Sequence, residues 1–184
     1  MKSLKLSVGA LALAGALSFA RAENLPPGQV DFGAFTPPSG GGQFVEVNIT
    51  SSLISMVSKF VEKEDADIAK VLNGLHQIRV NVIGLDDANR PEIAKRAQKV
   101  RKELDGKGWE RIVTAQQKNQ DVSVYLKTRE KDTVEGLVIV VMDGTKQAVF
   151  VNIVGDIKPE QLAMVADKFH LEPLKKIAEE TQRH

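Results

Sequence analysis

Two apolar runs that flank a short turn constrain the fold of this chain more than any other feature. Residues 136–142 (GLVIVVM) and 147–154 (QAVFVNIV) are joined by residues 143–146 (DGTK). An Asp-Gly pair between apolar runs is a strong signal for a β-hairpin. Since an isolated hairpin is marginally stable at best, the sequence predicts further strands and a layer that covers them.

Apolar patterns before this hairpin predict three more strands and a helix. Residues 75–84 alternate between apolar and polar side chains, as in a strand with one buried face, and residues 109–116 and 122–128 predict two further strands. The connections between the last four strands are too short for parallel crossovers, so these strands are predicted to be antiparallel. The helix between residues 93 and 104 is predicted to bury Ile93, Ala97, Val100 and Leu104.

Further helices are predicted on both sides of this core. A short strand or extended segment at residues 44–49 precedes two helices, and another helix begins at Pro159, with a last one from about Leu171. The predicted fold class is α+β: an antiparallel sheet of about five strands with helices packed mainly on one face, in the order β-α-β-β-β-β-α after N-terminal helices. The first helix has an apolar face formed by Leu53, Met56, Val57 and Phe60.

The N-terminus has the three-part pattern of a secretory signal peptide. Two lysines precede an uncharged run at residues 6–20, and small residues follow at Ala20 and Ala22. The run of about 15 residues is shorter than the roughly 20 that a membrane-spanning helix needs. We therefore expect cleavage before Glu23, no transmembrane span in the mature chain and a periplasmic location, with an N-terminal membrane anchor as the alternative.

Charge and cysteine content exclude several function classes. The formal net charge is +1, and the leader supplies three positive charges, so the mature part is slightly acidic and has no broad field for nucleic acid. With no cysteine, disulfides, thiolate nucleophiles and zinc–thiolate sites are impossible. The expected organisation is a signal peptide at 1–22, a Pro/Gly-rich tail at 23–43 and a single α+β domain at 44–184. The tail is interpreted as a spacer, with docking through Val30, Phe32 and Phe35 as the alternative.

No constellation of residues indicates catalysis or metal binding. The three histidines, His76, His170 and His184, lack metal-ligand spacing, and no serine stands in a nucleophile-elbow motif. Gly155 and Asp156 are interpreted as a bend before the Pro159 helix, with a functional acid as the alternative. We predict no catalytic residue, no metal, no cofactor and no enzymatic activity.

One helix face is rich in basic residues. Between residues 90 and 107 the basic side chains outnumber the acidic ones. A soluble helix face explains this pattern, and peripheral contact with anionic lipid or an acidic partner is the alternative. The candidate contacts are Lys95, Lys99 and Lys102.

The strand at 136–142 is apolar on both faces, which is unusual for an antiparallel sheet with helices on one side. One face should pack against the helices, and the other must be covered within the chain, associate with a partner or a second copy, or hold a ligand. The cover would come from residues 30–35 or from the terminal helix. The candidate interaction face comprises Leu137, Ile139, Val141, Phe150 and Asn152.

The hairpin segment at 138–162 (VIVVMDGTKQAVFVNIVGDIKPEQL) resembles the family known as domain of unknown function 4252. The segment at 50–75 (TSSLISMVSKFVEKEDADIAKVLNGL) and the strand after it are similar too, so the resemblance covers roughly residues 44–167. It implies a small exported bacterial protein, and this chain differs from the lipoprotein members because it has no cysteine to acylate. The resemblance implies no activity, substrate or catalytic residue.

The sequence therefore favours an exported, non-enzymatic binding or protein-interaction module. Its partner is an unidentified protein or a second copy of the chain. The alternative is a periplasmic carrier of an apolar small molecule or lipid.

Overall fold

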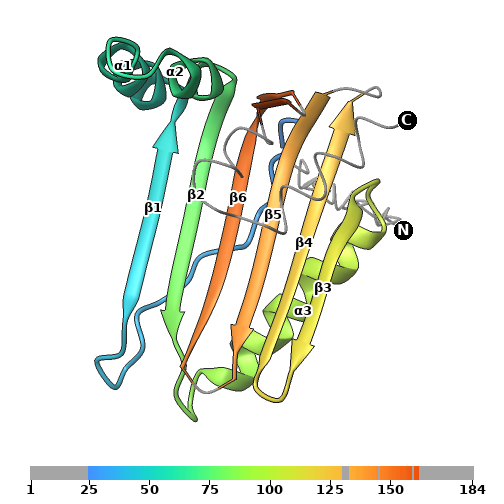
Figure 1. Ribbon diagram of the computed structural model, residues 1–184. Helices are drawn as coiled ribbons and strands as arrows, with labels where there is room; N and C mark the ends of the chain where they lie inside the picture. Colours follow the sequence, from blue (N-terminus) through green and yellow to red (C-terminus); the bar gives the residue numbers. More distant parts are fainter. Residues whose placement is uncertain (1–24, 130–132, 145, 159, 162–184) are drawn as a thin grey trace, which may run out of the picture.

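A six-stranded antiparallel sheet organises the chain in this computed structural model, which describes residues 25–129, 133–144, 146–158 and 160–161 (Figure 1). The strand order is β1-β2-β6-β5-β4-β3, and each neighbouring pair is antiparallel. The predicted leader, its cleavage residues and the helices predicted beyond Pro159 lie outside the described residues. The strands are β1 (Phe44–Thr50), β2 (Leu75–Gly84), β3 (Glu110–Gln117), β4 (Gln120–Arg129), β5 (Thr133–Asp143) and β6 (Gln147–Ile157).

The predicted hairpin forms the centre of this sheet. Asp143 pairs with Gln147 at the turn, and the ladder continues to a pair between Val134 and Ile157. The α+β class and the antiparallel arrangement are confirmed. The sheet has six strands rather than the predicted five or so, because the segment predicted as a short strand or extended entry forms a full strand, β1. All residues of β1 pair with β2.

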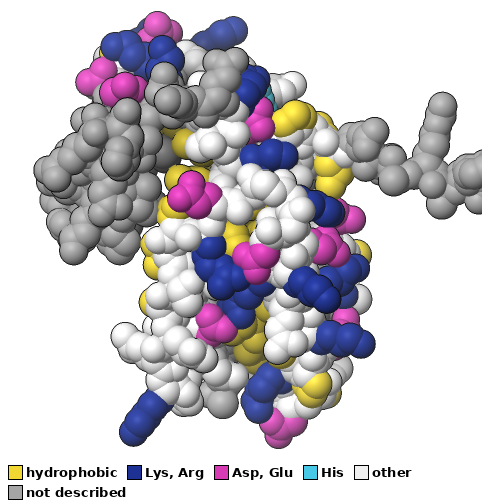
Figure 2. Space-filling model, turned by 90° about the vertical axis from the view of Figure 1, so that its right-hand side faces the viewer, with side chains coloured by type: hydrophobic (Ala, Val, Ile, Leu, Met, Phe, Trp, Pro, Cys, Tyr) yellow, Lys and Arg dark blue, Asp and Glu magenta, His cyan; other side chains and the backbone are white. Residues whose placement is uncertain are grey.

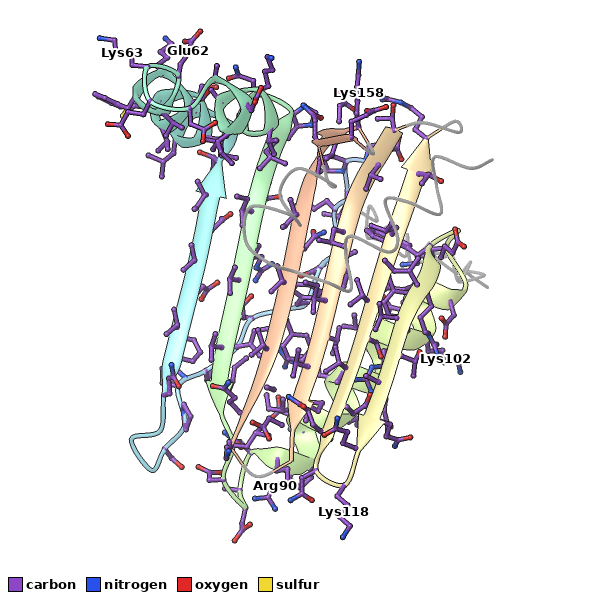
Figure 3. All side chains as sticks on the ribbon, in the orientation of Figure 1. Glu62, Lys63, Arg90, Lys102, Lys118 and Lys158 are labelled. Atoms are coloured by element: carbon purple, nitrogen blue, oxygen red, sulfur yellow. The ribbon has the colours of Figure 1, made fainter. Side chains whose placement is uncertain are left out.

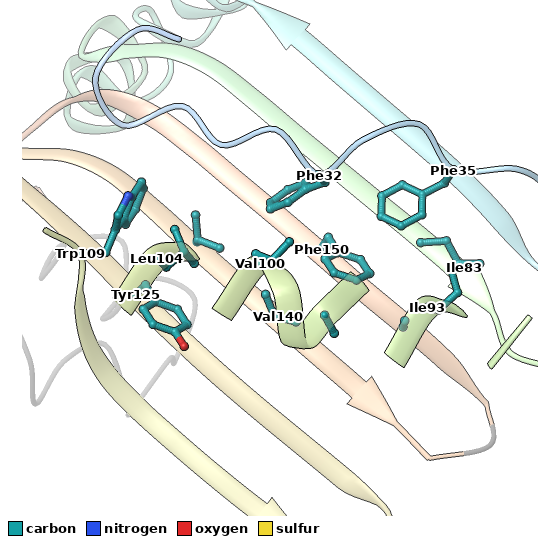
Figure 4. Close-up of a cluster of buried hydrophobic side chains, with 13 residues drawn as sticks. Phe32, Phe35, Ile83, Ile93, Val100, Leu104, Trp109, Tyr125, Val140 and Phe150 are labelled. Carbon is teal, nitrogen blue, oxygen red and sulfur yellow. The ribbon is translucent and has the colours of Figure 1, made fainter. Parts of the chain in front are cut away.

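One face of the sheet is covered by a helix and by an extended segment (Figure 1). Helix α3 (Arg90–Asp105) packs on it through the predicted stripe of Ile93, Ala97, Val100 and Leu104. Residues 25–43, which we call the strap, cross the same face as an extended segment. Phe32 and Phe35 of the strap both pack against the ring of Phe150 in β6 (Figure 4).

The strap is therefore part of the folded unit, and the prediction of a tail or spacer for this segment is wrong. Phe32 is only 2% exposed. The side chain of Asn152 accepts a hydrogen bond from the backbone amide of Val30 at 2.9 Å and donates one to the carbonyl of Gly28 at 2.9 Å. Burial of the two aromatic rings and satisfaction of the backbone groups outweigh the flexibility expected from the Pro/Gly composition.

Helices α1 (Ser51–Val61) and α2 (Ala66–Asn73) lie together beyond the ends of β1 and β2 (Figure 1). A buried serine joins them, since the hydroxyl of Ser58 donates to the carbonyl of Ala69 at 3.2 Å and contacts Oδ1 of Asn73 at 2.7 Å. Asp65 caps α2 by accepting from the amide of Ile68 at 3.1 Å. The pair is fixed at the end of the sheet beside β1.

The docking of the strap can be tested by a pair of substitutions within it. Phe32→Ala is expected to lower the free energy of unfolding by about 3–5 kcal/mol, because it removes a buried ring from the core. Leu25→Ala is the matched control: Leu25 is 40% exposed, so its loss should change stability by about 0.5 kcal/mol or less. Urea unfolding, followed by the fluorescence of the single tryptophan, Trp109, measures both. Equal effects of the two substitutions would contradict a docked strap.

Candidate functional site

The structure divides the predicted interaction face between the two sides of the sheet. In the β5–β6 ladder Val140 lies opposite Phe150, and Val138 opposite Asn152. Directly opposed residues of an antiparallel pair point to the same face. The prediction that Phe150 and Asn152 extend the face of Leu137, Ile139 and Val141 is therefore wrong, because the register set by the turn places both residues beneath the strap.

The remaining three residues do not form an exposed patch. Leu137 is 5% exposed, and Ile139 and Val141 are half-buried. Leu137 and Ile139 belong to a second apolar cluster whose described members all come from strands. This face therefore offers less accessible apolar surface than the sequence suggested.

The largest exposed apolar side chains gather on α1 instead. The sequence predicts an apolar face for this helix, and the structure turns that face outward while Ile54 and Ser58 pack inward. Four large side chains are between 43% and 74% exposed, and they occupy one helix face: Leu53, Met56, Val57 and Phe60. The sequence signal that could have found this orientation is Ser58, since its hydroxyl can be buried only where α2 supplies partners.

The apolar stripe of α1 directly follows an apolar row on β1 along the chain. Strand β1 ends at Thr50 and α1 begins at Ser51, so no loop separates them. β1 is the first strand in the order of the sheet, so among the described residues it has a strand partner on one side only. We call the two sets together the edge surface: Val45, Val47 and Ile49 of β1, and Leu53, Met56, Val57 and Phe60 of α1.

A small pocket near the end of β6 brings together charged residues that the sequence did not connect. Asp156 forms an ion pair with Arg129 at 2.7 Å and lies 3.8 Å from Nε2 of His76, while Nε of Arg129 lies 3.8 Å from Glu135. The pocket has a volume of about 290 Å³ and is open to solvent. Arg129 pairs with both carboxylates, and its pair with Asp156 is about half exposed, so that pair contributes little energy.

The glycine beside this pocket has a structural role. A Cβ atom at Gly155 would collide with the carbonyl of Gly74, whose oxygen also accepts a hydrogen bond from the amide of Asp156 at 2.7 Å. Strand β6 nevertheless runs through Gly155 and Asp156 to Ile157, so the interpretation of these two residues as a bend at the end of the strand is wrong. Gly155 instead allows the close approach of two backbones where the pairing of β2 with β6 shifts its register. Within the described residues, no group of three or more His, Asp or Glu side chains is arranged to hold a metal ion.

Two ion pairs tie α3 to the sheet. Arg101 forms an ion pair with Asp121 at 2.6 Å, and Arg111 pairs with Asp105 at 2.5 Å while lying 5.2 Å from the centre of the Tyr125 ring. The hydrogen bond to Asp105 raises the pKa of Arg111, so this side chain stays charged. Burial raises the pKa of Tyr125, against the opposing effect of the Arg111 charge.

The predicted anionic-surface contacts lie on the outer side of α3. Lys95, Lys99 and Lys102 are exposed, and Lys102 projects away from the sheet (Figure 3). Lys99 pairs with Glu103 at 3.7 Å. Positive and negative side chains alternate over this side of the molecule (Figure 2), so the basic residues do not form a patch of one sign. No described helix is long and apolar enough to cross a membrane.

A family model described as a domain of unknown function, DUF4252, matches residues 40–165. The match includes every described helix and strand and begins after most of the strap. Searches of curated proteins and of solved structures found no match to the chain.

The raised pKa of Tyr125 predicts a loss of stability at alkaline pH. The unfolded chain ionises its tyrosine near the ordinary value of about 10, whereas the folded chain keeps its proton to higher pH. The stability that the buried, neutral phenol contributes is therefore fully present below pH of about 10, and it is lost as pH rises through the folded pKa. Because the chain has a single tyrosine, tyrosinate absorbance reports this residue alone.

The measurement compares that absorbance titration in buffer and in concentrated urea, and the folded protein should titrate at the higher pH. Tyr125→Phe is the control, since it should lose less stability than the parent chain above pH of about 10. Identical titrations in the two solvents would contradict burial of the phenol.

Proposed function

Because the chain belongs to the DUF4252 family, a domain of unknown function, we propose its function from its own surface: it is a non-enzymatic protein-interaction module that binds through the edge surface. The observation that carries the proposal is the exposed stripe of α1. Phe60 at 74% and its three neighbours place large apolar side chains in water on one helix face. Contiguous exposed apolar patches mark interaction surfaces in soluble proteins.

The chemistry of the edge surface supports a protein partner. It combines an apolar helix face with a strand that, among the described residues, has no partner on its outer side. Proteins recognise both features by laying a helix in a groove or by adding a strand. The seven side chains of the edge surface carry no charge. Such a surface offers a partner apolar area to bury and backbone groups to hydrogen-bond, rather than reactive side chains for catalysis.

Two other functions have weaker support. An apolar carrier needs a cavity that encloses its ligand, and the pocket described above is small and open, with Arg129, Glu135 and Asp156 among its lining residues. An enzyme needs convergent groups with a free reactive member. The described ionisable groups around the pocket and under α3 are instead engaged in structural ion pairs.

Export of the module is supported by the leader pattern alone. The charged start, the apolar run and the small residues before Glu23 support a periplasmic location for the mature chain. The absence of cysteine is consistent with a domain that relies on its core instead of disulfides.

Site-specific photo-crosslinking tests the proposal. A photoreactive phenylalanine derivative replaces Phe60 in cells that produce the protein, and the same derivative replaces Lys102 in a control chain. Both positions are exposed helix residues, so accessibility to solvent is matched. The derivative at Phe60 is expected to give one or a few discrete heavier bands that are absent from the Lys102 control. The same pattern at both positions, or no band at Phe60, would contradict an interaction through the edge surface.

A further inference from the structure

We propose that the partner of the edge surface is a second copy of this chain, which adds its β1 antiparallel to β1 across a two-fold axis. This inference rests on the proposed function and specifies its partner. The result is one sheet that continues through both protomers. Closed two-fold association is the commonest way in which identical chains assemble.

The outer edge of β1 lacks the features that normally prevent such pairing. β1 pairs with β2 through seven consecutive residues without a bulge, contains no proline and has one charged side chain, Glu46. The opposite edge is different: β3 begins with the charged residues Glu110 and Arg111, and its pairing with β4 shifts between Arg111 and Val113. Bulges, prolines and charges protect natural edges, whereas a regular edge with few charges is able to add a strand.

The sequence of β1 selects a register for this pairing. A two-fold axis at Val47 pairs all seven residues, because Val47 is the central residue of the strand. It places Val45 opposite Ile49 of the partner subunit, so the apolar rows continue across the axis. It also places Glu46 opposite Asn48 of the partner subunit. An axis at Glu46 would instead bring two carboxylates face to face, which is unfavourable.

The same register explains why the exposed stripe lies on α1. With Val47 on the axis, Thr50 lies opposite Phe44 of the partner subunit. Since α1 begins at Ser51, each α1 lies at the beginning of the partner's β1. The apolar face of α1 is thus carried to the ends of the new strand pair, where association can remove it from water.

A charge substitution tests the register. Asn48→Glu places a carboxylate opposite Glu46 in both symmetry-related pairs, and the dimer dissociation constant should rise about tenfold. The folded protomer should tolerate this change, because position 48 is exposed and Glu retains an oxygen that can accept from Gln77. Adding Glu46→Gln removes the repulsion and should restore the dimer. Sedimentation equilibrium on the mature chain measures all three proteins.

Cysteine cross-linking gives an independent readout because the natural chain has no cysteine. Directly opposed residues across an antiparallel pair have Cα atoms about 4.5–5.5 Å apart, which suits a disulfide. Val47→Cys should therefore form a disulfide-linked dimer under mild oxidation. Ala115→Cys, in the opposite edge strand β3, is the control. It should remain monomeric in denaturing electrophoresis without a reducing agent.

The outcomes separate this inference from the proposed function. A monomer in sedimentation equilibrium, combined with a discrete band from Phe60 that contains another protein, overturns the second copy but leaves an interaction module. A dimer that resists Asn48→Glu and cross-links through Ala115→Cys also overturns it, because the chains then associate elsewhere. A monomer with no crosslink at Phe60 overturns both proposals.

Discussion

The side-chain amide of Asn152 holds the strap against the sheet, and closure of the covered face depends on that contact. The amide satisfies one donor and one acceptor of the strap backbone, at Val30 and Gly28. Each of these groups would cost about 1–3 kcal/mol if it were buried without a partner. α3 contacts β3 and β5, and the strap brings Phe32 and Phe35 onto β6. Without the strap, the ring of Phe150 at the centre of the sheet would lose both of these aromatic contacts.

Two arginines, one from β2 and one from α3, also bind the strap. Arg79 of β2 donates to the carbonyl of Gly33 at 3.2 Å, and Arg96 of α3 donates to the carbonyl of Ala34 and lies 4.7 Å from the centre of the Phe35 ring. Each guanidinium offers several donors to carbonyls that have no strand partner. The polar residues that alternate along β2 therefore face the strap rather than open solvent. Among them, Arg79 supplies a hydrogen-bond donor to the strap in addition to the strap's apolar contacts.

Local periodicity was enough to predict the central hairpin and the buried stripe of α3. Both depend on spacing within a few residues, and an Asp-Gly turn or a recurrence every three or four positions is visible in the sequence. The strap was not predictable in this way, since its order comes from Asn152, more than a hundred residues away. The outward turn of α1 likewise depends on the hydrogen bonds between Ser58 and α2. The face of Phe150 depends on which residues pair across the turn, and alternation within one strand does not reveal that register.

The position of β1 at the margin of the sheet follows from the docking of the strap. Phe35 of the strap belongs to the same cluster as Ile83, and Phe44 begins β1 directly opposite Ile83. The carbonyl of Gln43 accepts from the amide of Gly84 at 2.6 Å, which fixes the chain beside the end of β2. The inner side of β2 is already paired with β6, so a strand that enters at this point can add only to the outer side. The interaction that closes one face of the sheet therefore also places a regular strand, and the apolar helix that follows it, at the edge of the described sheet.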